Sequence, residues 1–276
     1  MNLSNIYPDY GCLCLFLGKQ SIKHYIVTDN MQKILAETIL QLAVIFPLVI
    51  IALNKKNRES IEVVSVFFIF FICNKLLLNL PLRYEELRIV AGNWNWTGKI
   101  YAILGSVLFL VVYRKFKREY YFLTLKQNSK FKRNGLKTVM GVFIIGLVIS
   151  SIFLSSRNWD LETIIFQLTM PGLDEELAFR GIILGLLTQV LKKDMRFFGV
   201  GLSSPAIWIT SILFGLVHSL FFSSTYEIQF YFGSFCNSLI YGLIWAWLTF
   251  KSGSILMALI SHNLANTTLN LIRMMK

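Results

Sequence analysis

The chain has 276 residues, of which 55% are hydrophobic and 15% charged, and its mean hydropathy is +0.59. Soluble globular domains carry about 25% charged residues, so this composition excludes an ordinary soluble domain. The formal net charge is +12, but the basic residues lie between long apolar stretches. There they serve as topogenic signals and contact anionic lipid headgroups, so we expect no nucleic-acid partner.

Eight apolar stretches are long enough to form membrane-spanning helices. Such a helix needs about 20 apolar residues to cross a hydrocarbon core of about 30 Å. The first and third stretches are less regular, because Glu37 and Lys99 lie near their ends. We therefore expect an all-α fold, a polytopic membrane bundle of about eight transmembrane helices. In chain order the stretches are 34–53, 61–80, 98–113, 137–156, 163–191, 201–222, 228–250 and 254–272.

This pattern divides the chain into three regions. The sequence predicts an N-terminal tail over 1–33, N-terminal transmembrane helices over 34–156 and a transmembrane core over 157–276. The start, Met1–Asp9, has no basic residue, so we expect no cleavable signal peptide. Lys and Arg are concentrated in the loops after the first, third, fifth and seventh stretches. Because basic loops face the cytoplasm, the expected topology places both termini on the outer side.

Ionisable side chains interrupt the fifth apolar stretch. A charge inside hydrocarbon is costly, so each such residue is a functional candidate. Glu176 and Arg180 are four residues apart, which allows an ion pair on one helix face. That pair leaves Glu175, about 100° further around the helix, to face another partner.

Histidines occur at a similar depth in two later stretches. Phe214 and His218 are four residues apart on one helix face, and so are His262 and Asn266. The expected topology places these residues and Glu175 in the outward half of the membrane. A carboxylate, two imidazoles and a carboxamide that meet in a dry cavity suit activation of water and stabilisation of an oxyanion.

The three motifs together resemble those of the CPBP family. Glu-Glu-x-x-x-Arg, Phe-x-x-x-His and His-x-x-x-Asn stand in this order on successive apolar segments. The family, also called Abi, comprises CAAX prenyl endopeptidases and bacteriocin-processing or bacteriocin-immunity proteins. The resemblance covers about residues 160–272, and Gly92–Lys99 also resembles a segment found upstream in some bacterial members. It implies that 157–276 is a CPBP-type catalytic core, and that the protein is an intramembrane glutamic endopeptidase.

The resemblance also implies roles for single residues. Glu175 would activate the attacking water, with His218 as its partner. His262 and Asn266 would stabilise the tetrahedral oxyanion. The residues that would support the shape of the site are Glu176, Arg180 and Phe214.

A catalytic zinc ion is the alternative to a mechanism without a cofactor. Glu175, His218 and His262 could supply its three protein ligands, with water as the fourth. However, the HExxH motif is absent, and pairing of Glu176 with Arg180 leaves no second carboxylate to act as base. The four cysteines show no CxxC spacing, which speaks against a thiolate site. We therefore expect no metal or other cofactor.

Two other classes of function stay open on the sequence. A non-hydrolytic membrane scaffold would bind and regulate another membrane or cell-envelope enzyme. A transporter would use the buried Glu and His as a proton relay, but the chain shows no internal repeat.

An endopeptidase would have the lipid bilayer, a membrane-protein partner and a peptide substrate as its partners. The substrate would be a membrane-associated or lipidated protein, or an exported peptide. We expect a multi-pass protein of a bacterial plasma membrane. The CAAX resemblance implies cleavage on the cytosolic side, whereas the distribution of basic residues places the site nearer the outer side.

Overall fold

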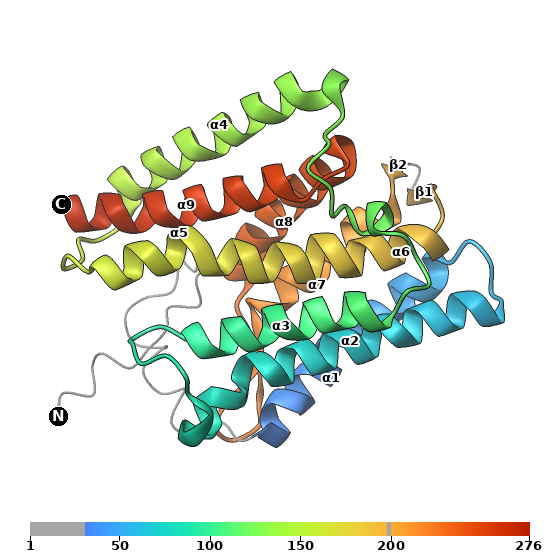
Figure 1. Ribbon diagram of the computed structural model, residues 1–276, viewed down its shortest axis with the longest axis horizontal. Coiled ribbons are helices and arrows are strands. Elements are labelled where there is room, and N and C mark those ends of the chain that lie inside the picture. The colour runs from blue at the N-terminus through green and yellow to red at the C-terminus, as the bar shows by residue number, and fades with distance from the viewer. Residues whose placement is uncertain (1–30, 198–199) are drawn as a thin grey trace.

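The computed structural model describes residues 31–197 and 200–276, and most of this part of the chain is helical (Figure 1). The greater part of the expected tail 1–33 therefore lies outside the described residues. In chain order the helices are α1 (Met31–Ala52), α2 (Arg58–Arg83), α3 (Trp96–Val112), α4 (Ser129–Phe153), α5 (Leu161–Glu175), the π-helix η5 (Glu176–Ile183), α6 (Leu184–Val190), α7 (Pro205–Val217), α8 (Phe232–Ser252) and α9 (Leu256–Met275). Short 3-10 turns, η3 (Glu85–Leu87) and η4 (Arg118–Tyr121), lie in the connections.

Several helices begin where the sequence supplies a capping side chain. An Asn or Asp side chain that accepts a backbone N–H satisfies one of the donors left free at a helix start. The capping residues are Asn57 for α2, Asn95 for α3, Asn128 for α4 and Asp160 for α5.

The fold is mostly helical, as expected, and two short antiparallel hairpins interrupt it. Strand β1 (Asp194–Phe197) pairs with β2 (Val200–Ser203), and β3 (Leu220–Phe222) pairs with β4 (Ile228–Phe230). The apolar stretches expected as helices over 201–222 and 228–250 were therefore too long. Helix α7 begins only at Pro205, because proline favours the first helical position and the residue before it avoids helical geometry.

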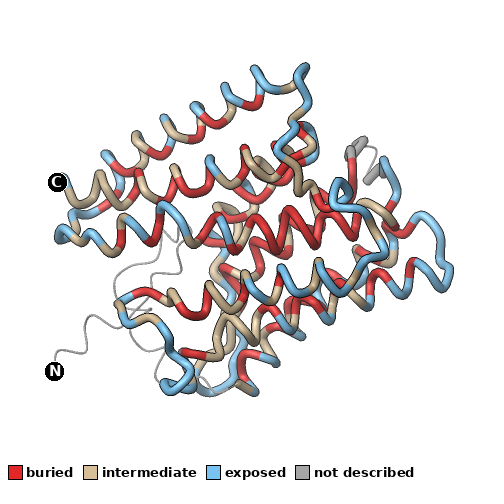
Figure 2. The backbone as a smooth tube through the Cα atoms, in the orientation of Figure 1, coloured by how far each residue is buried: buried red, intermediate tan, exposed pale blue. Residues whose placement is uncertain are grey.

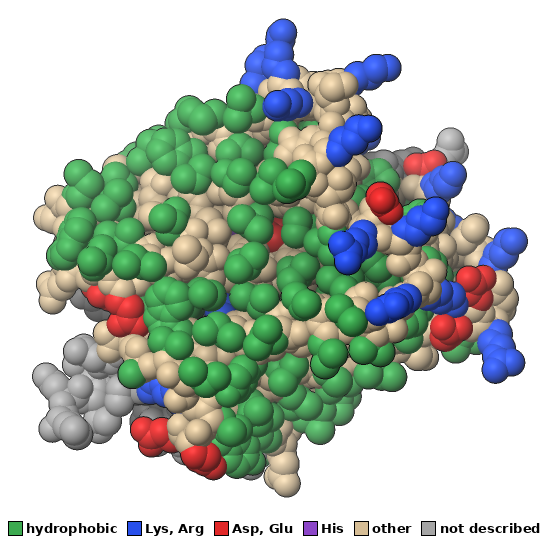
Figure 3. Space-filling view, viewed as in Figure 1, with side chains coloured by type: hydrophobic (Ala, Val, Ile, Leu, Met, Phe, Trp, Pro, Cys, Tyr) green, Lys and Arg blue, Asp and Glu red, His purple; other side chains and the backbone are tan. Residues whose placement is uncertain are grey.

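Length and composition support membrane spanning for part of the helices. Helices α1, α2 and α4 are long and apolar enough to cross a membrane, while α3 and α7 are apolar but shorter. Apolar side chains on the outer face of α4 are exposed, among them Ile144, Ile145 and Ile152. Figure 3 shows such side chains spread over the visible face of the bundle. The structure thus supports an integral membrane helix bundle, and the number of eight spans stays a prediction.

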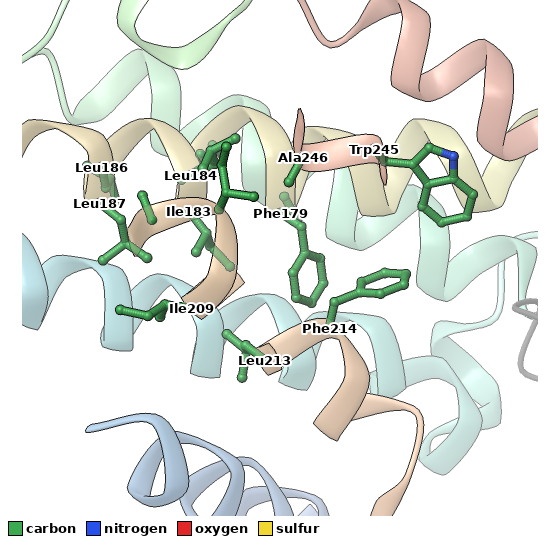
Figure 4. Packing of buried hydrophobic residues seen from close by; sticks show 14 of the residues in the cluster. Phe179, Ile183, Leu184, Leu186, Leu187, Ile209, Leu213, Phe214, Trp245 and Ala246 are labelled. Atoms are coloured by element: carbon green, nitrogen blue, oxygen red, sulfur yellow. The ribbon is translucent and has the colours of Figure 1, made fainter. Parts of the chain in front are cut away.

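The continuous helix made of α5, η5 and α6 runs through the middle of the bundle (Figure 1). It carries the longest run of buried residues, coloured red in Figure 2. Helix α9 packs against both α4 and α5, α7 packs against α8, and α2 packs against α1 and α3. Around η5 the core is aromatic: Phe179, Phe214 and Trp245 come from η5, α7 and α8 and lie close together (Figure 4).

The basic loops meet at one end of the bundle. Backbone hydrogen bonds join Asn54 to Val190, Asn128 to Ser252 and Ile255 to Phe122. These bonds connect the loops after α1, α3, α6 and α8, and the first three of these loops carry several Lys and Arg residues. Figure 3 shows Lys and Arg side chains gathered at the end that carries β1 and β2. Which membrane face this end adjoins stays a prediction from the positive-inside rule.

Candidate active site

The central helix changes its geometry where the candidate residues begin. Pro171 has no backbone N–H, which weakens the α-helical bonding around it. The Gly172 N–H donates to Asn263 Oδ1 on α9 at 2.8 Å, and Asn263 Nδ2 donates to the Thr169 carbonyl at 3.3 Å. A Cβ at position 172 would collide with this amide, so glycine permits the close contact between α5 and α9. The π-helix η5 follows, and such wide turns occur often at functional sites.

Glu176 and Arg180 form the ion pair that their spacing predicts. Arg180 Nε lies 3.3 Å from Glu176 Oε2, and both side chains are completely buried. The second carboxylate oxygen, Oε1, lies 2.8 Å from Nδ1 of His262 on α9. The Arg180 guanidinium also lies 4.3 Å from the centre of the Phe214 ring. These contacts hold three helical elements together and place a nitrogen of Arg180 or His262 beside each oxygen of Glu176.

Glu175 points to a different set of partners. Its Oε1 accepts a hydrogen bond from Lys99 Nζ at 2.9 Å. Its Oε2 lies 4.0 Å from His218 Nε2 and 3.9 Å from His262 Nε2, and it has no hydrogen-bond partner within the described part of the chain. The structure therefore brings Glu175, His218 and His262 together, as the three motifs predicted.

Hydrogen bonds at the far ring nitrogens set the orientation of both histidines. His218 Nδ1 lies 2.8 Å from the Phe214 carbonyl oxygen, which only accepts, so Nδ1 carries the proton. In the neutral imidazole, Nε2 is then a proton acceptor that faces Glu175. His262 likewise directs Nδ1 to the Glu176 carboxylate, and its ring stacks on Trp245 with centroids 3.9 Å apart.

Asn266 lies one turn beyond His262 on α9 and is buried. Its backbone carbonyl accepts a hydrogen bond from Asn270. A contribution of its side chain to an oxyanion site stays a prediction.

Lys99 is the functional candidate that sequence reasoning missed. In the sequence it stands out only as an irregularity near the end of an apolar stretch. In the structure it is buried, and its Nζ binds Asp174 Oδ2 at 2.8 Å as well as Glu175. The resemblance of Gly92–Lys99 to an upstream family segment was the only signal that pointed to this region.

The residues before Lys99 fix α3 against α5. The Trp94 ring stacks on Phe166 with centroids 4.8 Å apart, and its Nε1 donates to Thr163. The Glu162 carboxylate accepts from Trp96 Nε1 and from the Asn93 backbone N–H. Because these contacts hold the first turn of α3, Lys99 reaches Glu175 from a fixed position.

A cavity of about 110 Å³ adjoins Glu175. His218 and Lys99 line it beside Glu175, while α1 and α2 form the opposite wall. Arg83 and Asn95 extend it towards the end of the bundle opposite the basic loops. The polar residues on the α1 and α2 wall are Glu37, Thr38, Gln41, Asn74, Lys75, Asn79 and Arg83.

The alternative chemistry for these side chains is a metal site. Over residues 31–197 and 200–276, no group of three His, Cys, Asp or Glu side chains has an arrangement that could hold a metal ion. The zinc alternative built on Glu175, His218 and His262 thus gains no geometric support. Independence from metal stays a prediction that chelation can test.

The fold and this cluster define a class of protein, a helical membrane protein with a buried carboxylate and two imidazoles beside an internal cavity. Residues 157–268 match the family model described as "Type II CAAX prenyl endopeptidase Rce1-like". This part of the chain therefore belongs to the CPBP family, as the motifs indicated. Searches of curated proteins and of solved structures found no match. Family membership supports an intramembrane endopeptidase in general.

Proposed function

We propose that the protein is an intramembrane endopeptidase in which Glu175 activates the attacking water. One observation carries this proposal: Glu175 Oε2 is buried, has no hydrogen-bond partner among the described residues, and lies within 4.0 Å of two imidazole nitrogens. Two atoms about 4 Å apart can both hydrogen-bond to one water molecule at about 2.8 Å from each. A water molecule between Glu175 and His218 would therefore face a carboxylate base and a proton-accepting nitrogen.

The proposed reaction proceeds in two steps. Glu175 accepts a proton from water as the water oxygen forms a bond to the carbonyl carbon of the substrate, which yields a tetrahedral oxyanion. The C–N bond then breaks, and the proton held by Glu175 passes to the leaving nitrogen. The products are a new carboxyl terminus and a new amino terminus, and Glu175 returns to its carboxylate form.

His262 contributes to oxyanion stabilisation only in its doubly protonated form. Its Nδ1 is engaged with Glu176, so Nε2 can donate a hydrogen bond only when the ring is an imidazolium. The Glu176 carboxylate contacts Nδ1, and the Trp245 ring stacks on the imidazole, so both fix the direction in which Nε2 points. Asn266, one turn along α9, is proposed to supply a second donor.

Lys99 acts in this proposal as a positioning residue for Glu175. By binding Oε1, it directs Oε2 towards the histidines, and it compensates the charges of Asp174 and Glu175 inside the bundle.

We further propose that the substrate enters from the end of the bundle opposite the basic loops. The cavity extends towards that end, where Arg83 and Asn95 line it. In a multi-pass protein of a bacterial plasma membrane, the positive-inside rule places that end outside. An exported peptide or an envelope protein would then be the substrate, whereas a prenylated protein would require the opposite orientation.

The test compares wild type with Glu175→Gln and Glu119→Gln in a strain that lacks the gene. Glu119 is exposed in η4 at the basic end, so its substitution controls for the loss of one carboxylate. We expect new protein N-termini in the membrane and released fractions with wild type and Glu119→Gln, and none with Glu175→Gln. Identical N-termini in all three strains, with the phenotype restored by Glu175→Gln, would contradict hydrolysis and favour the scaffold function.

A further inference from the structure

Lys75 is a second cation inside the bundle, and its environment differs from that of Lys99. It lies in α2, one of the helices long and apolar enough to cross a membrane, and it lines the cavity beside Glu175. Within the described ranges, no carboxylate lies within 4.0 Å of its ammonium group. A charge inside a membrane bundle is costly, so a lysine without a direct counter-ion points to a ligand.

The acidic groups nearest Lys75 are already engaged. Charges that act on it come from Glu37 of α1, from Lys99 of α3, and from Asp174 and Glu175 of α5. Asp174 and Glu175 both bind Lys99, and Glu37 Oε1 accepts the backbone N–H of Phe222. These carboxylates lower the cost of the Lys75 charge without forming an ion pair with it, so its hydrogen-bond donors stay available to a ligand in the cavity.

Arg83 extends the same wall towards the end of the bundle opposite the basic loops. It follows Lys75 by eight residues, which places both on one face of α2 about 12 Å apart along the helix axis. Its Nε is buried and has no hydrogen-bond partner in the described part of the chain, and neither has Gln41 Oε1 on α1. An extended peptide covers 12 Å with about three to four residues. The wall thus offers two cations and an amide acceptor at the spacing of a short peptide segment.

From these observations we infer that Lys75 binds a carboxylate of the substrate polypeptide, and that Arg83 contacts the same polypeptide about three to four residues further along. The inference rests on the proposed function and names the substrate class of the same site, a peptide with a negative charge near the cleaved bond. The carboxylate can be the C-terminus of the substrate or an Asp or Glu side chain. A doubly charged phosphate fits less well, because Glu37, Asp174 and Glu175 face the same cavity and repel it. Since α1 and α2 precede residues 157–268, specificity would come from the half of the chain outside the family match.

The experiment uses the full-length protein and a synthetic peptide that spans a bond cleaved only when Glu175 is present. The peptide is prepared in three forms: unmodified, with an amidated C-terminus, and with its Asp and Glu replaced by Asn and Gln. The enzymes are wild type, Lys75→Met, Arg83→Met, Lys75→Arg as the charge-retaining variant, and Lys56→Met as the control. Lys56 is exposed in the loop between α1 and α2, at the opposite end of the bundle.

We expect Lys75→Met to raise KM for the unmodified peptide about tenfold, with kcat changed less than about twofold. Arg83→Met should raise KM less, because Arg83 is only half-buried, while Lys75→Arg and Lys56→Met should stay near wild type. One neutral peptide form should raise KM for wild type to the same extent and show no further loss with Lys75→Met. If the amidated peptide shows this effect, the bound carboxylate is the C-terminus; if the peptide with Asn and Gln shows it, the bound carboxylate is a side chain.

Three results would overturn the inference. The first is an equal KM of wild type for all three peptide forms, a comparison that needs no folded variant. The second is an equal loss of kcat/KM for all forms with Lys75→Met, which indicates a structural role for the lysine. If no Glu175-dependent cleavage occurs at all, the proposed function fails and the inference fails with it, whereas the first two results leave the proposed function intact.

Discussion

Two adjacent carboxylates on the central helix lie in opposite environments. Glu176 faces inward, where Arg180 and His262 contact its two oxygens and no part of the side chain is exposed. Glu175 faces the cavity, where Lys99 binds one oxygen and the other has no hydrogen-bond partner among the described residues. A fully buried carboxylate that is ion-paired with a guanidinium stabilises structure, whereas one that faces a cavity is accessible to water and substrate and can react. Glu175 and Glu176 thus have the same side chain but different environments, because they lie on different faces of the helix.

The largest effect on stability is expected on the Glu176 face. Arg180→Met leaves the Glu176 carboxylate buried without its guanidinium partner, and breaking a buried pair in this way costs about 3–5 kcal/mol. The thermal unfolding temperature in detergent should fall sharply. Arg133→Met, at an exposed position of α4, is the control and should unfold near the wild-type temperature. Equal unfolding temperatures for both variants would show that the buried ion pair is not what holds η5 in place.

On the Glu175 face, substitution of Lys99 should impair catalysis. Lys99→Met removes the group that orients Glu175, and we expect kcat to fall about 10- to 100-fold with a smaller change in KM. Lys99→Arg retains a cation and should recover part of the loss, while Lys132→Met on the exposed face of α4 should resemble wild type. A purely structural lysine would instead give equal losses for Lys99→Met and Lys99→Arg, accompanied by loss of folded protein.

A smaller effect is expected at the contact between α5 and α9. In Gly172→Ala the new methyl group displaces the Asn263 amide, which breaks two hydrogen bonds and costs about 1–3 kcal/mol. Gly141→Ala in α4 is the matched control, because no atom lies within 4 Å of the added Cβ and alanine favours helix. Unfolding temperatures of the two variants should therefore shift in opposite directions. A Gly172→Ala protein as stable as wild type would argue against this contact.

No effect is expected from thorough chelation of the purified protein. The proposed mechanism uses Glu175 as the base and draws on no metal ion. Cleavage of the Glu175-dependent bond should continue at the same rate after dialysis against a strong chelator. Loss of cleavage that zinc restores would instead support the site built on Glu175, His218 and His262.

Local spacing was sufficient to predict part of the site. The four-residue spacing of Glu176 and Arg180 predicted their ion pair, since residues four apart share a helix face. Helix geometry also predicted that Glu175, about 100° around the helix from Glu176, faces other partners. The structure brings it within 4.0 Å of His218 and His262. The catalytic roles of these residues stay predictions.

Contacts between distant segments could not be predicted in this way. Lys99 meets Asp174 and Glu175 from another helix, and no periodicity links residues so far apart in sequence. In addition, a lysine near the end of an apolar stretch usually extends its ammonium group to the membrane surface, so its position alone did not indicate a buried ion pair. The hairpin of β3 and β4 was missed for a similar reason, because its aromatic and aliphatic residues match an apolar helix until their pairing is known.

The central claim is tested most directly by measuring cleavage and thermal unfolding for Glu175→Gln and Glu176→Gln side by side. Glu175→Gln should unfold near the wild-type temperature, because Lys99 keeps Asp174 as its charge partner and the Gln oxygen can still accept its hydrogen bond. Its cleavage rate should fall about 10²–10⁴-fold, because the base is removed. Glu176→Gln should unfold at a clearly lower temperature, because Arg180 and His262 lose their shared carboxylate. Two results would contradict this account. An active Glu175→Gln protein would show that Glu175 is not the base, and a Glu176→Gln protein as stable as wild type would show that Glu176 does not stabilise the fold.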